Sequence, residues 1–367
     1  MTPAGLYIHV PFCRGKCPYC DFYSLPVSEE RLEQYTRKME ETIEKWGRDS
    51  GEHPFDTIYF GGGTPSLLGG ERIGRLIRMV RECFLLYEPE ITLEANPDED
   101  FVCFAGDFAA AGVNRLSFGL QSANPHELEL LHRKHTVNMA AEAVRAAQAA
   151  GVRNISLDLM LALPEQTEAD IARSVDFCRE LGATHVSAYL LKVEPGTAFY
   201  KHRETLSVPD DDRAAELYLF AVQKLGLAGY EQYEISSFAC GKGYQSRHNL
   251  KYWNAEEYLG LGPSAHSFYD GRRFYWPRSF RGFLGRTEPV KDGSGGTFEE
   301  YMMLRLRLTE GLREADVKRR FGRGIPREVY ENVRKIPPEY VKLTKEGICL
   351  TASGFLVSNS ILAALLP

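Results

Sequence analysis

Short apolar runs rich in β-branched and aromatic residues recur over the first 230 residues, and each is followed by a longer segment with helical periodicity. The runs predict six strands, at residues 6–10, 56–60, 90–94, 115–119, 154–158 and 185–189. The longer segments predict helices at residues 29–47, 71–84, 99–111, 125–150, 168–181 and 210–226, several of them ending at a glycine. This alternation is typical of a parallel βα array.

Six βα units are fewer than the eight of a closed TIM barrel, so we expect an α/β fold with a partial, TIM-like (β/α)6 barrel over residues 1–230. In such arrays the functional groups gather where the strands end. Residues 231–296 are aromatic and glycine-rich and are interpreted as a connecting region. Residues 297–367 predict a smaller C-terminal α+β domain, for which a winged-helix-like arrangement is one option.

Composition narrows the class of protein. The chain has 367 residues, of which 44% are hydrophobic, so it can bury a large core. The formal net charge of -6 and the scattered lysines and arginines disfavour nucleic-acid binding. No run approaches the roughly 20 apolar residues of a membrane span, and no signal-like segment opens the chain, so we expect a cytoplasmic protein. Its eight cysteines are too sparse for a disulfide scaffold.

Three of the cysteines lie close together, directly after the first predicted strand. Cys13, Cys17 and Cys20 form a C-x3-C-x2-C pattern, and Gly15 and Pro18 favour a loop there over a regular helix. A loop can turn three thiolates toward one point. Three thiolates suit three irons of a cubane cluster and leave the fourth iron free to chelate an amino and a carboxylate group.

Two alternatives remain from the residues alone. The first is a zinc site with His9 as a fourth ligand, and the second is a set of buried thiols with no shared role. Zinc favours a second ligand pair, and the later cysteines, at positions 83, 103, 178, 240 and 349, form no such pair.

The cysteine pattern, with the aromatic Tyr19 before its last member, resembles the radical S-adenosylmethionine (SAM) signature. The resemblance continues through residues 7–13, 61–65, 94–97, 114–117, 121–122, 158–160 and 229–236. It points to the family of anaerobic coproporphyrinogen III oxidases and their HemW-like haem chaperone relatives. It implies a barrel of radical SAM type, a [4Fe-4S] cluster on Cys13, Cys17 and Cys20, and bound SAM that the cluster reduces by one electron to methionine and a 5'-deoxyadenosyl radical.

The resemblance also implies which residues bind SAM. The glycine run after the second predicted strand lets backbone groups approach a ligand, and a nucleotide P-loop is the rival interpretation, but Gly69-Gly-Glu-Arg lacks its Lys-Ser/Thr. Carboxylates at strand ends can accept hydrogen bonds from ribose or amino groups, and an arginine fork suits the SAM carboxylate. The residues that match SAM-binding positions of the family are Tyr7, Tyr19, Gly62, Gly63, Thr64, Glu94, Gln121, Arg133 and Asp158. No second cysteine motif is present, so no auxiliary cluster is expected.

Within this family, three features favour the chaperones. Phe22 stands where the oxidases have a further cysteine, and only twelve residues precede Cys13, so decarboxylation of coproporphyrinogen III is not expected. The segment from His248 to Trp253 matches the H-N-x-x-Y-W pattern of HemW-like proteins. His248 is therefore a candidate haem ligand, with a packed, hydrogen-bonded histidine as the alternative. His132 departs from the family, which usually has glycine there.

Three functions follow. The first is a cluster- and SAM-binding chaperone that takes up haem and delivers it to apo-haemoproteins, with an electron donor as a further partner. The second is a radical enzyme acting on a tetrapyrrole, such as coproporphyrinogen III. The third is a zinc-stabilised binding module. The residues leave open whether SAM is cleaved during haem transfer.

Overall fold

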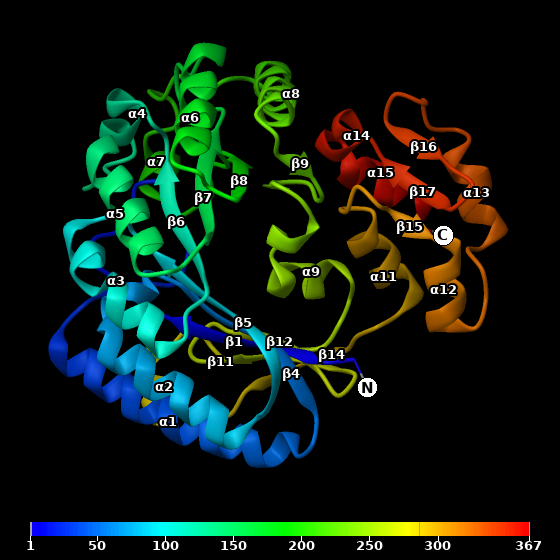
Figure 1. Ribbon diagram of the computed structural model, residues 1–367. Coiled ribbons are helices and arrows are strands. Elements are labelled where there is room, and N and C mark those ends of the chain that lie inside the picture. The colour runs from blue at the N-terminus through cyan, green and yellow to red at the C-terminus, as the bar shows by residue number, and fades with distance from the viewer. Residues whose placement is uncertain (1, 286, 367) are drawn as a thin grey trace.

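A computed structural model describes residues 2–285 and 287–366 and confirms an α/β fold with a curved, largely parallel sheet (Figure 1). The six predicted strands are present and lie side by side in chain order. They are β1 (Ala4–Val10), β4 (Pro54–Gly62), β5 (Leu85–Ala95), β6 (Arg115–Gln121), β7 (Asn154–Leu161) and β8 (His185–Leu190). Neighbouring strands in this series pair in parallel, so all their carboxyl ends lie on the same side of the barrel.

Helices cover the convex side of this sheet (Figure 1). They are α1 (Glu29–Ser50), α2 (Gly69–Cys83), α3 (Glu99–Ala111), α4 (Pro125–Leu130), α5 (Val137–Ala149), α6 (Glu168–Glu180) and α8 (Asp211–Leu227). Several begin at a side chain that accepts a hydrogen bond from the first turn, as Ser28 does for α1 and Asp210 for α8. The prediction of one helix over residues 125–150 is wrong. The chain breaks between α4 and α5, because His132 has a left-handed backbone (φ 52°) and Thr136 caps a new helix.

The stretch 231–296 adds strands to both edges of the sheet. Beyond β8 lie β10 (Ser237–Ala239) and β9 (Glu231–Gln232), and beyond β1 lie β11 (Tyr258–Leu261), β12 (His266–Tyr269), β13 (Arg272–Tyr275) and β14 (Val290–Ser294). β11 is parallel to β1, whereas the outer strands are antiparallel. The described part of the sheet is therefore an open array of 12 strands, from β14 at one edge to β9 at the other.

Short elements complete this part of the fold. They are β2 (Phe12–Cys13), β3 (Leu25–Pro26), η1 (Pro65–Leu68), α7 (Ala198–Lys201), η2 (Lys242–Tyr244), α9 (Arg247–Trp253) and α10 (Phe280–Leu284). The short helix α9 lies on the concave side of the sheet, against β1 and β4 (Figure 1). Within the described part of the chain, every helix is too short or too polar to cross a bilayer.

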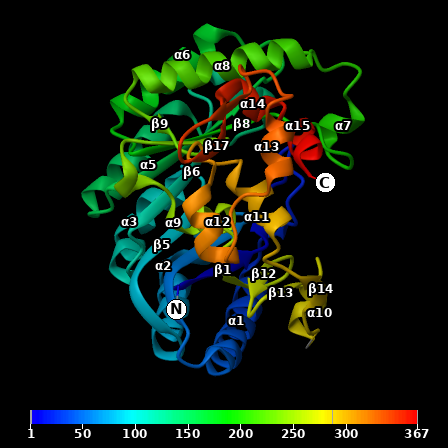
Figure 2. The same ribbon diagram turned by 90° about the vertical axis from the view of Figure 1, so that its right-hand side faces the viewer.

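The C-terminal residues form a smaller α+β unit, which lies beside the barrel in Figure 1 and in front of it in Figure 2. Its elements are α11 (Phe298–Arg305), β15 (Leu312–Arg313), α12 (Glu314–Phe321), α13 (Arg327–Val333), β16 (Val341–Leu343), β17 (Gly347–Leu350), α14 (Ala352–Leu356) and α15 (Ser358–Leu365). The strands form a separate sheet in the order β15-β17-β16. Buried residues such as Met302, Leu312 and Phe355 give this unit its own core.

Alternation along the strands divides apolar from polar side chains. Residues such as Ile8, Ile58 and Leu116 belong to the main hydrophobic core, which they share with the buried faces of the helices. The alternate positions face the concave side, because successive side chains of a strand point in opposite directions. Many of these are polar, among them Tyr7, Thr57, Tyr59, Glu90, Thr92, Glu94, Arg115, Ser117, Ser156, Asp158, His185 and Ser187. The concave side is therefore suited to binding and to hydrogen bonding.

Candidate functional site

The carboxyl ends of β4 to β8 surround a cavity of about 400 Å³. The cysteine loop, residues 13–24, and the end of β8 with the segment that follows it, residues 189–194, both contribute to its lining. The structure brings together at this cavity most of the residues predicted to bind the cluster or SAM: Cys13, Cys17, Tyr19, Cys20, Gly62, Gly63, Thr64, Glu94, Gln121, Arg133 and Asp158. Tyr7 and His248 lie elsewhere.

The three cysteines lie on one rim of the cavity as free, partly exposed thiols. Burial raises the pKa of the Cys13 and Cys20 thiols above the ordinary value. Cys13 is linked to the glycine run, because its sulfur lies 3.7 Å from the Thr64 hydroxyl. Cys17 is linked to the opposite side through Arg133, whose Nη1 lies 3.5 Å from its sulfur. The loop thus turns its thiols toward the space that the strand ends enclose.

The spacing of the three sulfurs bears on the zinc alternative. Thiolates about 2.3 Å from a single zinc ion are at most about 4.6 Å apart. Among the described residues, the one group of potential ligands whose atoms all lie within 4.8 Å contains no cysteine. The three sulfurs therefore do not all lie within 4.8 Å of one another, as ligands of one zinc ion would. His9 does not line the cavity, and its ring packs beneath Gly62.

The glycine run at the end of β4 packs tightly against the strand that leads to the cysteines. The Gly63 amide donates to the Val10 carbonyl at 2.8 Å, and the Thr64 amide donates to the Phe12 carbonyl at 2.7 Å. A Cβ atom on Gly63 would come within 2.5 Å of the Phe12 carbonyl oxygen. Gly62 adopts φ 115°, a backbone conformation that favours glycine. These residues hold the glycine run beside the cysteine loop.

Two carboxylates face the cavity from β5 and β7, the strands on either side of β6. Glu94 accepts a hydrogen bond from the Tyr59 hydroxyl at 2.7 Å and another from the Gly62 amide at 3.1 Å. Asp158 accepts one from the Ser117 hydroxyl at 3.2 Å. Burial raises the pKa of Glu94 to about 7 and that of Asp158 to about 6. A cationic or hydroxyl-rich ligand would stabilise both ionised forms.

Arg133 projects into the cavity from the break between α4 and α5. Its Nη2 donates to the Asn96 side-chain oxygen at 2.6 Å and to the Gly119 carbonyl at 2.7 Å. Asn96 in turn donates to the Thr64 hydroxyl at 3.3 Å. The guanidinium is therefore fixed in orientation beside Cys17, as recognition of a carboxylate requires.

Comparison with known proteins agrees with this arrangement. Residues 7–178 match the family model described as the radical SAM superfamily, and residues 298–357 match the HemN C-terminal domain. The heme chaperone HemW of Mycobacterium tuberculosis (strain ATCC 25618 / H37Rv) is 38% identical over 325 residues, which cover 84% of this chain and 83% of the relative. The chain belongs to the HemW family.

Two further relatives carry the same name. The heme chaperone HemW of Bacillus subtilis (strain 168) is 33% identical over 374 residues, covering 98% of each chain. The HemW of Escherichia coli (strain K12) is 38% identical over 320 residues, covering 84% of each. Among solved structures, the coproporphyrinogen III oxidase HemN of Escherichia coli matches with a TM-score of 0.83 and 21% identity, covering 99% of this chain and 90% of that one. That likeness confirms the fold.

The cavity of this HemW-family chain also includes residues that were not singled out from the sequence. Asn96 and Ser117 lie within segments that carried the family resemblance, so the signal for them was present. Tyr189, near the end of β8, and Lys192 and Glu194, in the segment after it, lie in sequence with no motif that would have marked them.

Tyr7 and His248 lie beneath the cavity instead of lining it. The Tyr7 hydroxyl is 3.0 Å from His9 Nδ1. His248 lies on α9 with only 1% of its surface exposed. Its Nδ1 is 2.7 Å from the Thr57 hydroxyl and its Nε2 is 2.8 Å from the Tyr252 hydroxyl. Ligation of haem iron by His248 therefore requires that α9 move and that the ring lose one of these hydrogen bonds.

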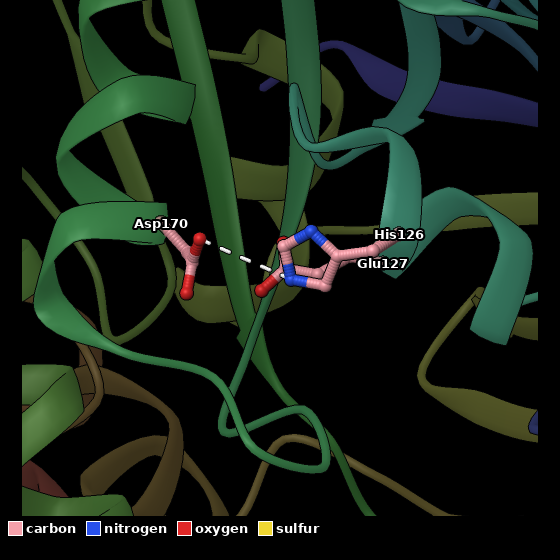
Figure 3. Close-up of side chains that lie close together, drawn as sticks. All are labelled: His126, Glu127 and Asp170. Atoms are coloured by element: carbon pink, nitrogen blue, oxygen red, sulfur yellow. Dashed lines mark ion pairs between the residues drawn. The ribbon is translucent and has the colours of Figure 1, made fainter.

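Within the part of the chain that the structure describes, one cluster of potential metal ligands lies outside the cavity, where His126, Glu127 and Asp170 approach one another (Figure 3). The dashed line joins His126 Nε2 to Asp170 Oδ1 at 3.9 Å. His126 and Glu127 are in the first turn of α4, and Asp170 completes the capping box of α6. Acidic side chains at such positions stabilise helix N-termini, whose dipoles repel cations. Asp170 thus has a role as a cap of α6, and Glu127 accepts hydrogen bonds from the Ser122 hydroxyl and from the Asn124 side chain.

Proposed function

We propose that this HemW-family protein holds a [4Fe-4S] cluster on Cys13, Cys17 and Cys20, binds SAM in the adjoining cavity, and carries haem to apo-haemoproteins. The observation that carries the first two parts is the convergence of three thiols, an oriented arginine and two carboxylates on one cavity. The haem cargo rests on the relatives named heme chaperone HemW, at 33% to 38% identity over most of the chain. When bound, the cluster supplies one electron to the SAM sulfonium.

The residues of this chain divide the binding of SAM between them. Arg133 offers its planar fork to the SAM carboxylate, and the backbone of Gly62 and Gly63 leaves room for the methionine end. Glu94 and Asp158 accept hydrogen bonds from amino or ribose hydroxyl groups. The same charge pattern orients a ligand that is cationic at its sulfonium and amino groups and anionic at its carboxylate.

A first experiment tests the metal. Protein purified and reconstituted without oxygen should contain about four irons and four sulfides per chain, as a cubane requires. It should also bind SAM in calorimetric titration. Stoichiometric zinc in place of iron would make the chain a zinc-stabilised module and would refute the proposal.

A second experiment tests the cargo. The reconstituted protein, with SAM and a reductant, is incubated with haem or with coproporphyrinogen III. We expect bound haem to pass to an apo-haemoprotein of different size, followed by its Soret absorption, and coproporphyrinogen III to remain unchanged. The side chain of Phe22, at the position where the oxidases have a cysteine, is 66% exposed and lines the cavity. Catalytic formation of protoporphyrinogen would instead assign the chain to the tetrapyrrole-modifying enzymes.

A further inference from the structure

A stack of side chains connects the buried helix α9 to the floor of the cavity. Tyr59 occupies the middle of this stack, on the concave face of β4, with 8% of its surface exposed. Its hydroxyl donates to Glu94 at 2.7 Å, and its ring centroid lies 5.1 Å from that of His248. Tyr59 therefore contacts both a predicted SAM-binding carboxylate and the histidine of the H-N-x-x-Y-W segment.

The His248 end of the stack is fixed on several sides. Its two ring nitrogens lie within hydrogen-bond distance of Thr57 and Tyr252, and its backbone amide donates to Glu90 at 3.3 Å. The Tyr252 ring is held in turn by an edge contact with Tyr258, at 4.5 Å between centroids. A ring with this many partners cannot turn without breaking a hydrogen bond, so it offers Tyr59 a rigid surface.

The Glu94 end depends on Tyr59. The Glu94 carboxylate has two hydrogen bonds that favour its ionised form, from the Tyr59 hydroxyl and the Gly62 amide. Burial and the charge of Asp158 oppose ionisation, and Arg115 supports it. Tyr7 also faces Glu94, and its own hydroxyl stays protonated because burial raises its pKa. The Tyr59 bond thus bears directly on whether Glu94 is an anion at neutral pH.

Gly61 shows how closely the stack approaches the glycine run. A Cβ atom at this position would lie 2.9 Å from the rings of both Tyr7 and Tyr59. Glycine here lets the two tyrosines pack directly under the loop that carries Gly62 and Thr64. Direct contacts through Tyr59 therefore join Glu94, at one end of the stack, to His248, at the other.

We propose that Tyr59, supported by the His248 ring, is a positioning residue for SAM, because it orients the Glu94 carboxylate and keeps it ready to accept hydrogen bonds. This inference rests on the proposed SAM site. It assigns the H-N-x-x-Y-W segment a structural role in SAM binding. In the conformation described, His248 packs against Tyr59 beneath the cavity.

The test is the equilibrium affinity for SAM, measured by calorimetry without oxygen from pH 6 to pH 9 on Tyr59→Phe and the parent. Loss of a hydrogen bond to a charged group predicts an affinity about tenfold lower at pH 7. It also moves the rise of affinity with pH to higher values, because that bond lowers the pKa of Glu94. His248→Ala, which leaves Glu94 and the Tyr59 hydroxyl in place, should lower the affinity by about twofold to fivefold, within the range of such packing contacts.

Tyr230→Phe is the matched control. It also removes a buried tyrosine hydroxyl, one that donates to the Ala183 carbonyl at 2.9 Å, and it lies outside the cavity lining. This variant should bind SAM like the parent at every pH. Equal loss of affinity in both tyrosine variants would overturn the inference, since it would show a general effect of stability.

Two further outcomes keep the inference apart from the proposed function. Parent protein that binds no SAM would refute the SAM site itself. Parent protein that binds SAM, together with a folded, iron-loaded Tyr59→Phe of equal affinity and equal pH profile, would refute the role of Tyr59 alone. If Tyr59→Phe does not retain iron, Glu94→Gln decides the question. The inference requires that SAM affinity no longer depend on pH near 7 in the Glu94→Gln variant. If that dependence on pH persisted, it would contradict the inference.

Discussion

The cavity and the region beneath it both use polar side chains on the concave side of the sheet, yet these groups differ in whether the protein itself satisfies them. Beneath the cavity, His185 and His248 each lie between two hydroxyl groups, at 2.7 to 2.8 Å. We call these two histidines and their hydroxyl partners the lumen cluster; the partners are Ser156, Tyr233, Thr57 and Tyr252. At the cavity, Glu94 and Asp158 are carboxylates whose pKa is raised, and the three cysteines are free thiols.

The difference separates a structural from a functional use of buried polar residues. Burial lowers the pKa of His248 to about 3 and that of His185 in the same direction, so both rings are neutral with their hydrogen bonds made. The cavity groups gain most from something that the protein does not itself supply, namely iron for the thiols and a cationic ligand for the carboxylates. A buried neutral group with its hydrogen bonds made stabilises the fold, whereas carboxylates whose pKa stays raised despite their hydrogen bonds, together with free thiols, indicate a binding site.

The largest expected effect is on the cysteines. Replacement of Cys13, Cys17 or Cys20 by Ser should abolish retention of the cluster, because the cubane would keep two of its three protein ligands. Iron and sulfide analysis of reconstituted protein measures this. Cys103→Ser and Cys240→Ser, both at exposed positions away from the cavity, are the controls and should keep the parent's iron content. Full iron in all three cluster variants would contradict the assignment.

The second effect concerns the lumen cluster. His248→Ala should lower the free energy of unfolding by about 2 to 4 kcal/mol, through the cavity it leaves and the unpaired hydroxyls of Thr57 and Tyr252. Urea unfolding measures the loss. His266→Ala, at an exposed position on β12, is the control and should change it little. An unchanged free energy of unfolding in His248→Ala would show that the ring does not brace the fold and would favour a role in ligand binding alone.

The central strands could be located from the sequence because each has buried apolar residues at alternate positions. The strands β12 to β14 could not, since they are four or five residues long and more polar. β14, for example, has every residue exposed, so no apolar alternation marks it. The break between α4 and α5 was missed because neither glycine nor proline marks it, and the left-handed residue is His132.

The candidate site was predictable to the extent that its residues lie within short motifs. Asn96 could have been predicted as a site residue, because it belongs to the sequence segment that contains Glu94. The partners of His248 could not, because Thr57 lies 191 residues away and nothing local indicates that the two meet. A motif can identify a residue as special, but whether it faces a ligand or completes the core depends on contacts distant in the sequence.

The third effect tests the orientation of the cavity's arginine. Arg133→Lys keeps the charge but loses the fork that bonds Asn96 and the Gly119 carbonyl. SAM affinity, measured by calorimetry, should fall about tenfold, the size of one charge-assisted hydrogen bond. Arg145→Lys on the exposed face of α5 should bind SAM like the parent. Equal SAM affinity of Arg133→Lys and Arg145→Lys would mean that a positive charge at position 133 is sufficient for SAM binding, without the planar arrangement of the guanidinium donors.

The smallest expected effect is on stability: in the protein without SAM, the buried Glu94 carboxylate lowers the free energy of unfolding when it is ionised. Its folded-state pKa of about 7 lies above the ordinary value of 4.5, so the folded protein binds the proton more tightly than the unfolded chain does. The contribution of this group to stability is therefore fully present below pH 4.5, and it is lost as the pH rises from there to about 7. Glu94→Gln removes this dependence and should stabilise the protein at pH 8 by on the order of 1 to 2 kcal/mol, after allowance for partial exposure. Urea unfolding at pH 5 and pH 8 measures the effect.

In the same Glu94→Gln variant, the free energy of SAM binding should weaken by more than the free energy of unfolding increases. The reason is that a neutral amide replaces the acceptor that a cationic ligand favours. The stabilisation of each variant by added SAM measures this loss. Asp212→Asn, at an exposed position in the first turn of α8, is the control and should show neither effect. If Glu94→Gln lost stability at pH 8, the carboxylate would be a satisfied structural group like the histidines of the lumen cluster, and the contrast between the two regions would not hold at this residue.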